Sequence, residues 1–233
     1  MDYAAIFHQR YSTALIADAA YRANFPLGIG TPGLAPLDRR QKLAGPAVTV
    51  QDNNDIISIL TAVHYAQPGD VIVVTNKTNA VALIGDIIGG EAHHKGLAGF
   101  VIDGRVRDTV ALLELDLTVV CLGTYPVGPL KLPDELKDIG KRDVALRLGE
   151  ATVHPGDWIF ADADGVICID AEHLPALYEQ AEQLLQREEN LIANIEKGTS
   201  LSEMVALESF LEKRAKDSTA DFNAHLAEHN QTI

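Results

Sequence analysis

Short runs of consecutive apolar residues alternate with stretches of helical periodicity through the first half of the chain. The runs are predicted strands, and they cover residues 45–50, 71–74, 100–102 and 117–121. The stretches with helical spacing are residues 13–24, 55–66, 79–95 and 108–114. Residues 25–37 are rich in Gly and Pro and are expected to form a loop. Continuously apolar strands that alternate with helices are typical of a sheet buried on both faces, so the pattern predicts an α/β fold.

The second half of the chain has a different pattern. Short apolar runs around turns predict hairpin strands at residues 151–153, 158–160 and 165–169. From Ala171 onward the chain is polar with helical spacing, which predicts one helix that ends at Gly198. A capping box of Ser200 and Glu203 predicts a second helix to about Lys216, with frayed residues after it. We therefore expect an α/β domain over residues 1–170. Residues 171–233 are expected to form a helical extension that packs on this domain or on a neighbouring subunit.

Composition and charge narrow the class of protein. The net charge is −14 and the basic residues are dispersed, so we expect no nucleic-acid partner. The chain has no apolar run long enough to span a bilayer and begins without a basic, then apolar, leader, so we expect a cytoplasmic protein without a membrane partner. Cys121 and Cys168 lie in apolar runs without metal-ligand spacing, which predicts a reduced, buried pair.

Two segments carry residues that suggest chemistry. Residues 99–108 read GFVIDGRVRD, an apolar run and a glycine turn that present Arg107 and Asp108 side by side. A fixed cation beside a hard oxygen ligand can hold a small keto acid and a divalent metal at one point. Residues 85–91 read GDIIGGE, and a helix that begins there would offer the Ile87 and Ile88 amides to a carboxylate. Asp86 would lie at the mouth of that site, or would only cap the helix.

Together, these segments resemble the RraA-like / class II 4-hydroxy-4-methyl-2-oxoglutarate aldolase family. Its members carry G-[DE]-x-x-A at a helix start and then G-x-V-I-D-G-x-V-R-D. Further segments of this chain fall where the family pattern expects them, namely 17–19, 43–50, 68–74, 153–157 and 161–166. The chain departs from the pattern at residues 75–79, where many members have a glycine-rich turn, and at Gly89, where alanine is common.

The resemblance implies a swivelling β/β/α domain that assembles as a homotrimer or homohexamer. It also implies a metal-dependent aldolase that cleaves a 4-hydroxy-2-oxo acid, or decarboxylates oxaloacetate, through a pyruvate enolate. The cofactor would be Mg²⁺ or Mn²⁺ held by Asp108, and Arg107 would contact the keto oxygen and steady the enolate. The amides of Ile87 and Ile88 would bind the substrate carboxylate. Asp86, with water, would protonate the enolate carbon.

Three alternatives remain at this point. RraA-type regulators share the fold and inhibit a ribonuclease without catalysis, but they typically lack the aspartate after the arginine. A Schiff base on Lys77 or Lys95 would make the protein a metal-free aldolase. The family is also sometimes labelled as a methyltransferase, yet the chain has no glycine-rich cofactor loop between a strand and a helix.

Overall fold

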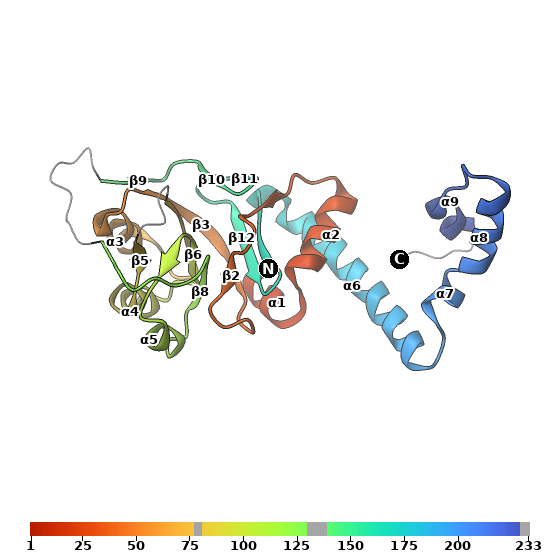
Figure 1. Cartoon of the computed structure of the whole chain (residues 1–233), viewed down its shortest axis with the longest axis horizontal. Coiled ribbons are helices and arrows are strands. Elements are labelled where there is room, and N and C mark those ends of the chain that lie inside the picture. The colour runs from red at the N-terminus through yellow and green to blue at the C-terminus, as the bar shows by residue number, and fades with distance from the viewer. Residues whose placement is uncertain (77–80, 130–138, 229–233) are drawn as a thin grey trace. The chain divides into compact units, whose positions relative to one another are not determined.

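The computed structural model describes residues 1–76, 81–129 and 139–228. The chain forms two compact units, Met1–Ala181 and Glu182–Ile233 (Figure 1). The first contains every strand of the described residues, and the second is helical. The mixed α/β class predicted from the apolar pattern is confirmed, and so is a long helix after the last strand. The predicted division between residues 170 and 171 stays a prediction.

The main sheet has a parallel part and an antiparallel part. The parallel strands are β3 (Leu43–Asp52), β4 (Val71–Asn76), β6 (Gly99–Asp103) and β8 (Thr118–Cys121). The antiparallel strands are β1 (Gly28–Ile29), β2 (Ala35–Pro36), β9 (Lys141–Arg142), β12 (Trp158–Asp162) and β13 (Gly165–Ile169). The order is β1-β13-β12-β3-β4-β6-β8-β2, with β9 beside β3. β3 joins the two parts because its first half pairs with β12 and its second half with β4.

The helices of the first unit are α1 (Tyr3–Arg10), α2 (Thr13–Ala23), α3 (Ile56–Tyr65), α4 (Asp86–His94) and α5 (Thr109–Leu113). Short polar side chains cap the starts of α1, α2 and α3, whereas α4 and α5 begin without a side-chain cap. Ser12 accepts a hydrogen bond from the Leu15 amide at the start of α2, and Asp55 accepts one from the Ser58 amide at the start of α3. Apolar side chains of β3, β4 and β6 fill separate cores on the two faces of the sheet. The strands are therefore buried on both faces, as their unbroken apolar runs predict.

Two elements of the first unit differ from the prediction. The segment 25–37 is not only loop, because β1 and β2 lie in it and pair at the edges of the sheet. The helix predicted over 79–95 begins only at Asp86, after the short strand β5 (Ala82–Ile84). β5 pairs in parallel with β7 (Arg105–Val106), and β10 (Leu146–Leu148) pairs with β11 (Ala151–Val153). A long-range strand pairing thus overrides the local helical spacing of residues 82–84.

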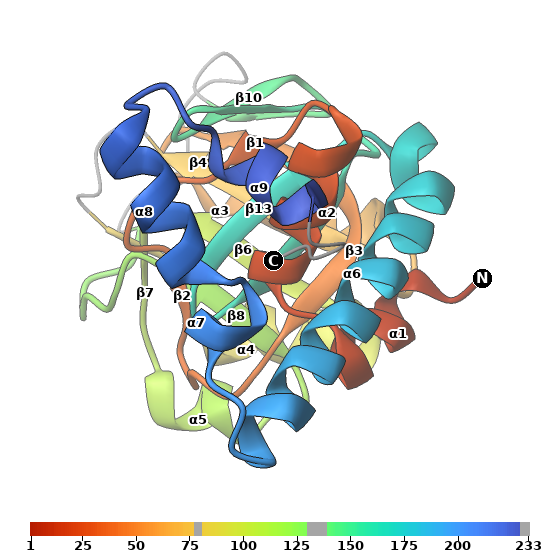
Figure 2. The same cartoon turned by 90° about the vertical axis from the view of Figure 1, so that its right-hand side faces the viewer.

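The C-terminal helices are also more broken than predicted. The 3₁₀ turn Ala171–His173 leads into α6 (Leu174–Glu196), and α7 (Leu201–Met204), α8 (Leu207–Lys216) and α9 (Phe222–Glu228) follow (Figure 2). The predicted single helix from Ser200 is wrong because Ala206, at φ 47°, interrupts it between α7 and α8. The prediction of frayed residues after Asp217 is also wrong, because α9 packs Phe222 on Phe210 and buries His225. The capping box of Ser200 and Glu203 is confirmed.

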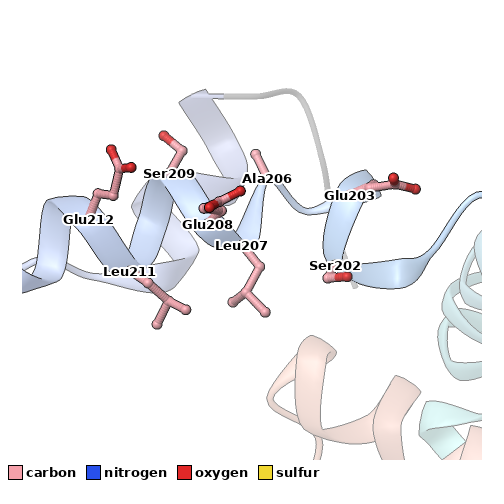
Figure 3. A pocket seen from close by; sticks show the side chains of 8 residues that line it. All are labelled: Ser202, Glu203, Ala206, Leu207, Glu208, Ser209, Leu211 and Glu212. Atoms are coloured by element: carbon pink, nitrogen blue, oxygen red, sulfur yellow. The ribbon is translucent and has the colours of Figure 1, made fainter.

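An open hollow of about 750 Å³ lies over α7 and α8. Figure 3 shows Leu207 and Leu211 of α8 pointing to the same side of the helix. Three glutamates also belong to its lining, namely Glu203, Glu208 and Glu212.

Among the residues that the structure describes, none of the helices combines the length and apolar character needed to cross a membrane.

Candidate functional site

Arg107 and Asp108 form an exposed corner at the end of β7. Asp108 has left-handed backbone angles, φ 55° and ψ 40°, and begins α5. Aspartate tolerates this conformation better than most residues do. One carboxylate oxygen of Asp108 lies 3.3 Å from Arg107 Nε, and the two side chains are 40% and 44% exposed. An exposed pair of this kind contributes little to stability, so both groups remain available to a ligand.

The start of α4 lies against this corner. The Arg107 amide donates a hydrogen bond to the Ile84 carbonyl at 3.0 Å, because β5 and β7 are neighbours. A Cβ atom added at Gly85 would collide with Oδ2 of Asp108 and would lie 3.1 Å from Cγ of Arg107. The two segments singled out in the sequence are therefore in contact. Only glycine at position 85 leaves the carboxylate its place.

Asp86 occupies the position where a ligand carboxylate was expected. Its Oδ1 accepts a hydrogen bond of 2.8 Å from the Ile87 amide. The Asp86 side chain is exposed, Ile87 is 82% exposed, and Ile88 is buried. The prediction of a free Ile87 donor is thus wrong for this conformation, because the adjacent carboxylate takes it. A ligand carboxylate that binds here must displace the Asp86 side chain.

A cavity of about 320 Å³ opens beside the corner. Its lining comes from the start of α5 and from the segment after β8; the residues are Arg107, Asp108, Thr109, Thr124, Tyr125 and Pro126. The Tyr125 amide donates to the Val106 carbonyl at 2.9 Å, which fastens this segment to β7. A Cβ atom at Gly128 would lie 2.7 Å from Nη1 of Arg107, so this second glycine makes room for the guanidinium.

Sequence reasoning missed Thr124, Tyr125 and Gly128. A signal existed, because the turn-forming segment 123–129 directly follows a parallel strand. Neighbouring parallel strands end at the same edge of a sheet, and binding residues gather there.

The donor set at the corner suits a hydrated divalent cation. Within residues 1–76, 81–129 and 139–228, no group of three or more His, Cys, Asp or Glu side chains could hold a metal ion. A cation bound at Asp108 would therefore keep most of its ligands as water or take them from the substrate. Mg²⁺ binds in this way, with one or two carboxylates and several waters. Asp108, a single carboxylate that is 40% exposed, fits this description.

The other candidates have structural partners. The Lys95 ammonium donates to the carbonyls of Val63 and His64 at the end of α3, which argues against a Schiff base there. Lys77 lies outside the described residues.

Cys121 and Cys168 are free and buried, as predicted, and burial raises the pKa of both thiols.

A buried polar cluster that contains two carboxylates, which we call the β3–α3 network, was not predicted. It consists of Asp52, Asp55, Ser58 and Asn76, all buried at the ends of β3 and β4 and the start of α3. Asp52 accepts hydrogen bonds from the Asn76 amide group, the Ser58 hydroxyl and the Asn54 backbone. Asp55 accepts from the backbone amides of Ser58 and Gly140, and it shares the single Ser58 hydroxyl proton with Asp52. Burial raises the pKa of Asp52, although these hydrogen bonds oppose the shift.

Comparison with known proteins agrees with the resemblance that residues 85–91 and 99–108 carry. Residues 13–168 match the RraA-like family, described as Aldolase/RraA. A protein of Halalkalibacterium halodurans is 35% identical over 187 residues, which cover 78% of this chain and 83% of that protein. Its name is "Putative 4-hydroxy-4-methyl-2-oxoglutarate aldolase".

Two solved structures share the fold. The first, titled as an S-adenosylmethionine: 2-dimethylmenaquinone methyltransferase of Geobacillus kaustophilus, is 30% identical with a TM-score of 0.60 and covers 68% of this chain and 96% of its own. The second is RraAS2 of Streptomyces coelicolor, titled an unusual member of the RNase ES inhibitor RraA protein family. It is 27% identical with a TM-score of 0.64 and covers 76% of this chain and 89% of its own.

Proposed function

Because the chain belongs to the RraA-like family, we propose that it is a divalent-metal-dependent carbon–carbon lyase. Its substrate is a 4-hydroxy-2-oxo acid of the 4-hydroxy-4-methyl-2-oxoglutarate type, or oxaloacetate. The contact between Gly85 and the Arg107–Asp108 pair is the observation that carries this proposal, because it brings a helix start, a cation and a carboxylate to one point. The name of the Halalkalibacterium halodurans relative supports the same reaction class.

Each residue has a distinct task in this proposal. The amides of Ile87 and Ile88, at the start of α4, bind the carboxylate of the keto acid once the Asp86 side chain has moved aside. The Arg107 guanidinium faces the 2-oxo oxygen, where negative charge develops. Asp108 would hold Mg²⁺ or Mn²⁺, and the cation would supply Lewis-acid withdrawal of electron density from the keto group.

Cleavage breaks the C3–C4 bond and leaves its electron pair on the pyruvate fragment as an enolate. The 4-hydroxyl group loses its proton and becomes the carbonyl of the second product. The displaced Asp86 carboxylate takes up that hydroxyl proton through water, and then returns it through water to C3 and completes pyruvate. In oxaloacetate, CO₂ takes the place of the second product, and the proton for C3 comes from water.

Exposed apolar side chains around the corner support an assembly in which a neighbouring subunit covers the site. Ile87 in the first turn of α4 is 82% exposed, and Val110 and Leu113 of α5 are 75% and 44% exposed. Clustered exposed apolar residues beside a polar site mark interfaces more often than free surface. We therefore include a homotrimer or homohexamer in the proposal, to be checked by light scattering.

The decisive experiment measures pyruvate release by the wild type and by Asp108→Asn. Asparagine also tolerates left-handed backbone angles, so the substitution removes the charge and keeps the turn. We expect turnover of oxaloacetate and 4-hydroxy-4-methyl-2-oxoglutarate with Mg²⁺ or Mn²⁺ and none with a chelator. The variant should lose roughly 1,000-fold in kcat/KM, a change of about 4 kcal/mol. Asp38→Asn, at a partly exposed carboxylate that also pairs with an arginine, serves as the matched control. Equal activity of Asp108→Asn and the wild type would refute the proposal.

The similarity to RraAS2 supports a second candidate function, in which the protein binds a ribonuclease and catalyses no reaction. The same two proteins distinguish it. Inhibition of an RNase E-type ribonuclease by both the wild type and Asp108→Asn, without pyruvate release by either, would favour the regulator.

A further inference from the structure

The cavity beside the Arg107–Asp108 corner extends away from the start of α4. Asp86, Ile87 and Ile88 are not among its lining residues. In the proposed function, the α-keto acid half of the substrate lies between α4 and Arg107. The space of about 320 Å³ on the other side of Arg107 is then left for the part of the substrate beyond C3.

The lining has the chemistry of a small polar subsite. Beyond the Arg107–Asp108 pair, it offers the hydroxyls of Thr109, Thr124 and Tyr125 and the apolar surfaces of Tyr125 and Pro126. Hydroxyl donors beside a guanidinium suit a carboxylate or hydroxyl group, and the ring suits a methyl or methylene group. A branched, oxygen-rich C4 fragment presents both.

The backbone fixes Tyr125 relative to Arg107. The Tyr125 amide donates to the carbonyl of Val106, the residue before Arg107, and Thr124 forms a parallel bridge with Val106. Pro126 further restricts the backbone of Tyr125 to extended conformations. Tyr125, which is 43% exposed, is therefore held beside the end of β7, where Arg107 follows.

We propose that Tyr125 is the residue that selects substrates by the fragment attached to C3. Its ring and hydroxyl contact the methyl, hydroxyl and carboxylate groups that a branched C4 carries. Oxaloacetate has no group beyond C4, because its C4 is the carboxylate that leaves as CO₂. This inference rests on the proposed function for the orientation of the substrate. It adds a determinant of specificity that the Arg107–Asp108 motif does not contain.

The test compares Tyr125→Ala and Tyr125→Phe with the wild type on two substrates. For 4-hydroxy-4-methyl-2-oxoglutarate, we expect Tyr125→Ala to raise KM about 10-fold with little change in kcat, the effect of one lost hydrogen bond with its packing. For oxaloacetate, kcat and KM should stay within about 2-fold. Tyr125→Phe should restore the contribution of the ring and leave only that of the hydroxyl. Tyr21→Ala, an exposed tyrosine on α2, is the matched control.

A binding measurement separates this inference from the proposed function. With Mg²⁺ present, calorimetry compares 2-oxoglutarate, which has a second carboxylate, with pyruvate, which has no fragment beyond C3. Tyr125→Ala should weaken 2-oxoglutarate about 10-fold and leave pyruvate unchanged. If the two proteins bind the ligands in this pattern but the wild type releases no pyruvate, the proposed lyase activity is refuted and the subsite at Tyr125 is supported. Equal losses for both ligands, or no loss for either, would overturn the role of Tyr125.

Discussion

The first unit has carboxylates in two opposite surroundings. Asp108 lies at the exposed corner beside Arg107, and Asp52 and Asp55 lie in the buried β3–α3 network. Asp108 is 40% exposed, its backbone is left-handed, and Arg107 is its ion-pair partner. Asp52 and Asp55 are at most 3% exposed, each accepts two hydrogen bonds from other donors, and the two share the single Ser58 hydroxyl proton. A buried charge is tolerated only when donors surround it, whereas an exposed charge keeps its lone pairs for a ligand. Burial and hydrogen bonding, more than residue type, therefore separate the carboxylates that hold the fold from those that can do chemistry.

The sharpest test of this contrast alters the exposed corner without touching its side chains. Gly85→Ala places a methyl group where Asp108 Oδ2 now lies. The carboxylate is the end of a flexible side chain and can move aside, so folding should be nearly unchanged. A ligand displaced by about 1 Å costs about 100-fold in turnover, or about 2.7 kcal/mol in the barrier. Pyruvate release measures this loss.

Gly90→Ala is the control for this substitution. It lies on the same helix, and a Cβ atom there meets nothing within 4 Å. Its turnover should equal that of the wild type. If Gly85→Ala also kept full activity, the contact between the start of α4 and the corner would have no part in the reaction.

The β3–α3 network should respond in stability instead of activity. Asp55→Ala removes the cap of α3 and leaves the amides of Ser58 and Gly140 without their acceptor. We expect a loss of about 2 kcal/mol in the free energy of unfolding. Urea denaturation followed by the fluorescence of Trp158, the single tryptophan, reports on the first unit. Asp108→Asn should change stability by less than about 0.5 kcal/mol in the same assay. Equal losses for both variants would erase the distinction between the two regions.

The sequence predicts the two halves of the site better than it predicts their contact. The apolar run before Arg107 and the helix start near Asp86 both follow from local spacing. The pairing of β5 with β7, which brings the two halves together, could not be predicted in this way. Residues 82–84 have the same apolar pattern as the helix that follows them in the sequence. The β3–α3 network escaped for a related reason. Residues 51–55 read QDNND and indicate a solvated turn, whereas Gly140, far along the chain, contributes to their burial.

The smallest expected effect concerns the pH dependence of stability. Burial raises the folded-state pKa of Asp52 above its ordinary value of 3.8. The protonated form is thus favoured on folding, so stability from this group is present at low pH and is lost as the pH rises through the folded pKa. Asp52→Asn has no such loss. Its stability relative to the wild type should therefore improve as the pH is raised from about 4 to about 8, and should level off above the folded pKa.

Asp38→Asn provides the opposite case for comparison in the same urea titrations. A hydrogen bond from Arg40 lowers the pKa of Asp38 to about 2, so its contribution is lost only as the pH falls through that value. The difference between Asp38→Asn and the wild type should stay constant over the range in which the Asp52→Asn difference changes. A flat Asp52→Asn difference would mean that the hydrogen bonds from Asn76, Ser58 and the Asn54 backbone outweigh the cost of burying its charge. The buried region would then resemble the exposed corner in tolerating a full negative charge at neutral pH.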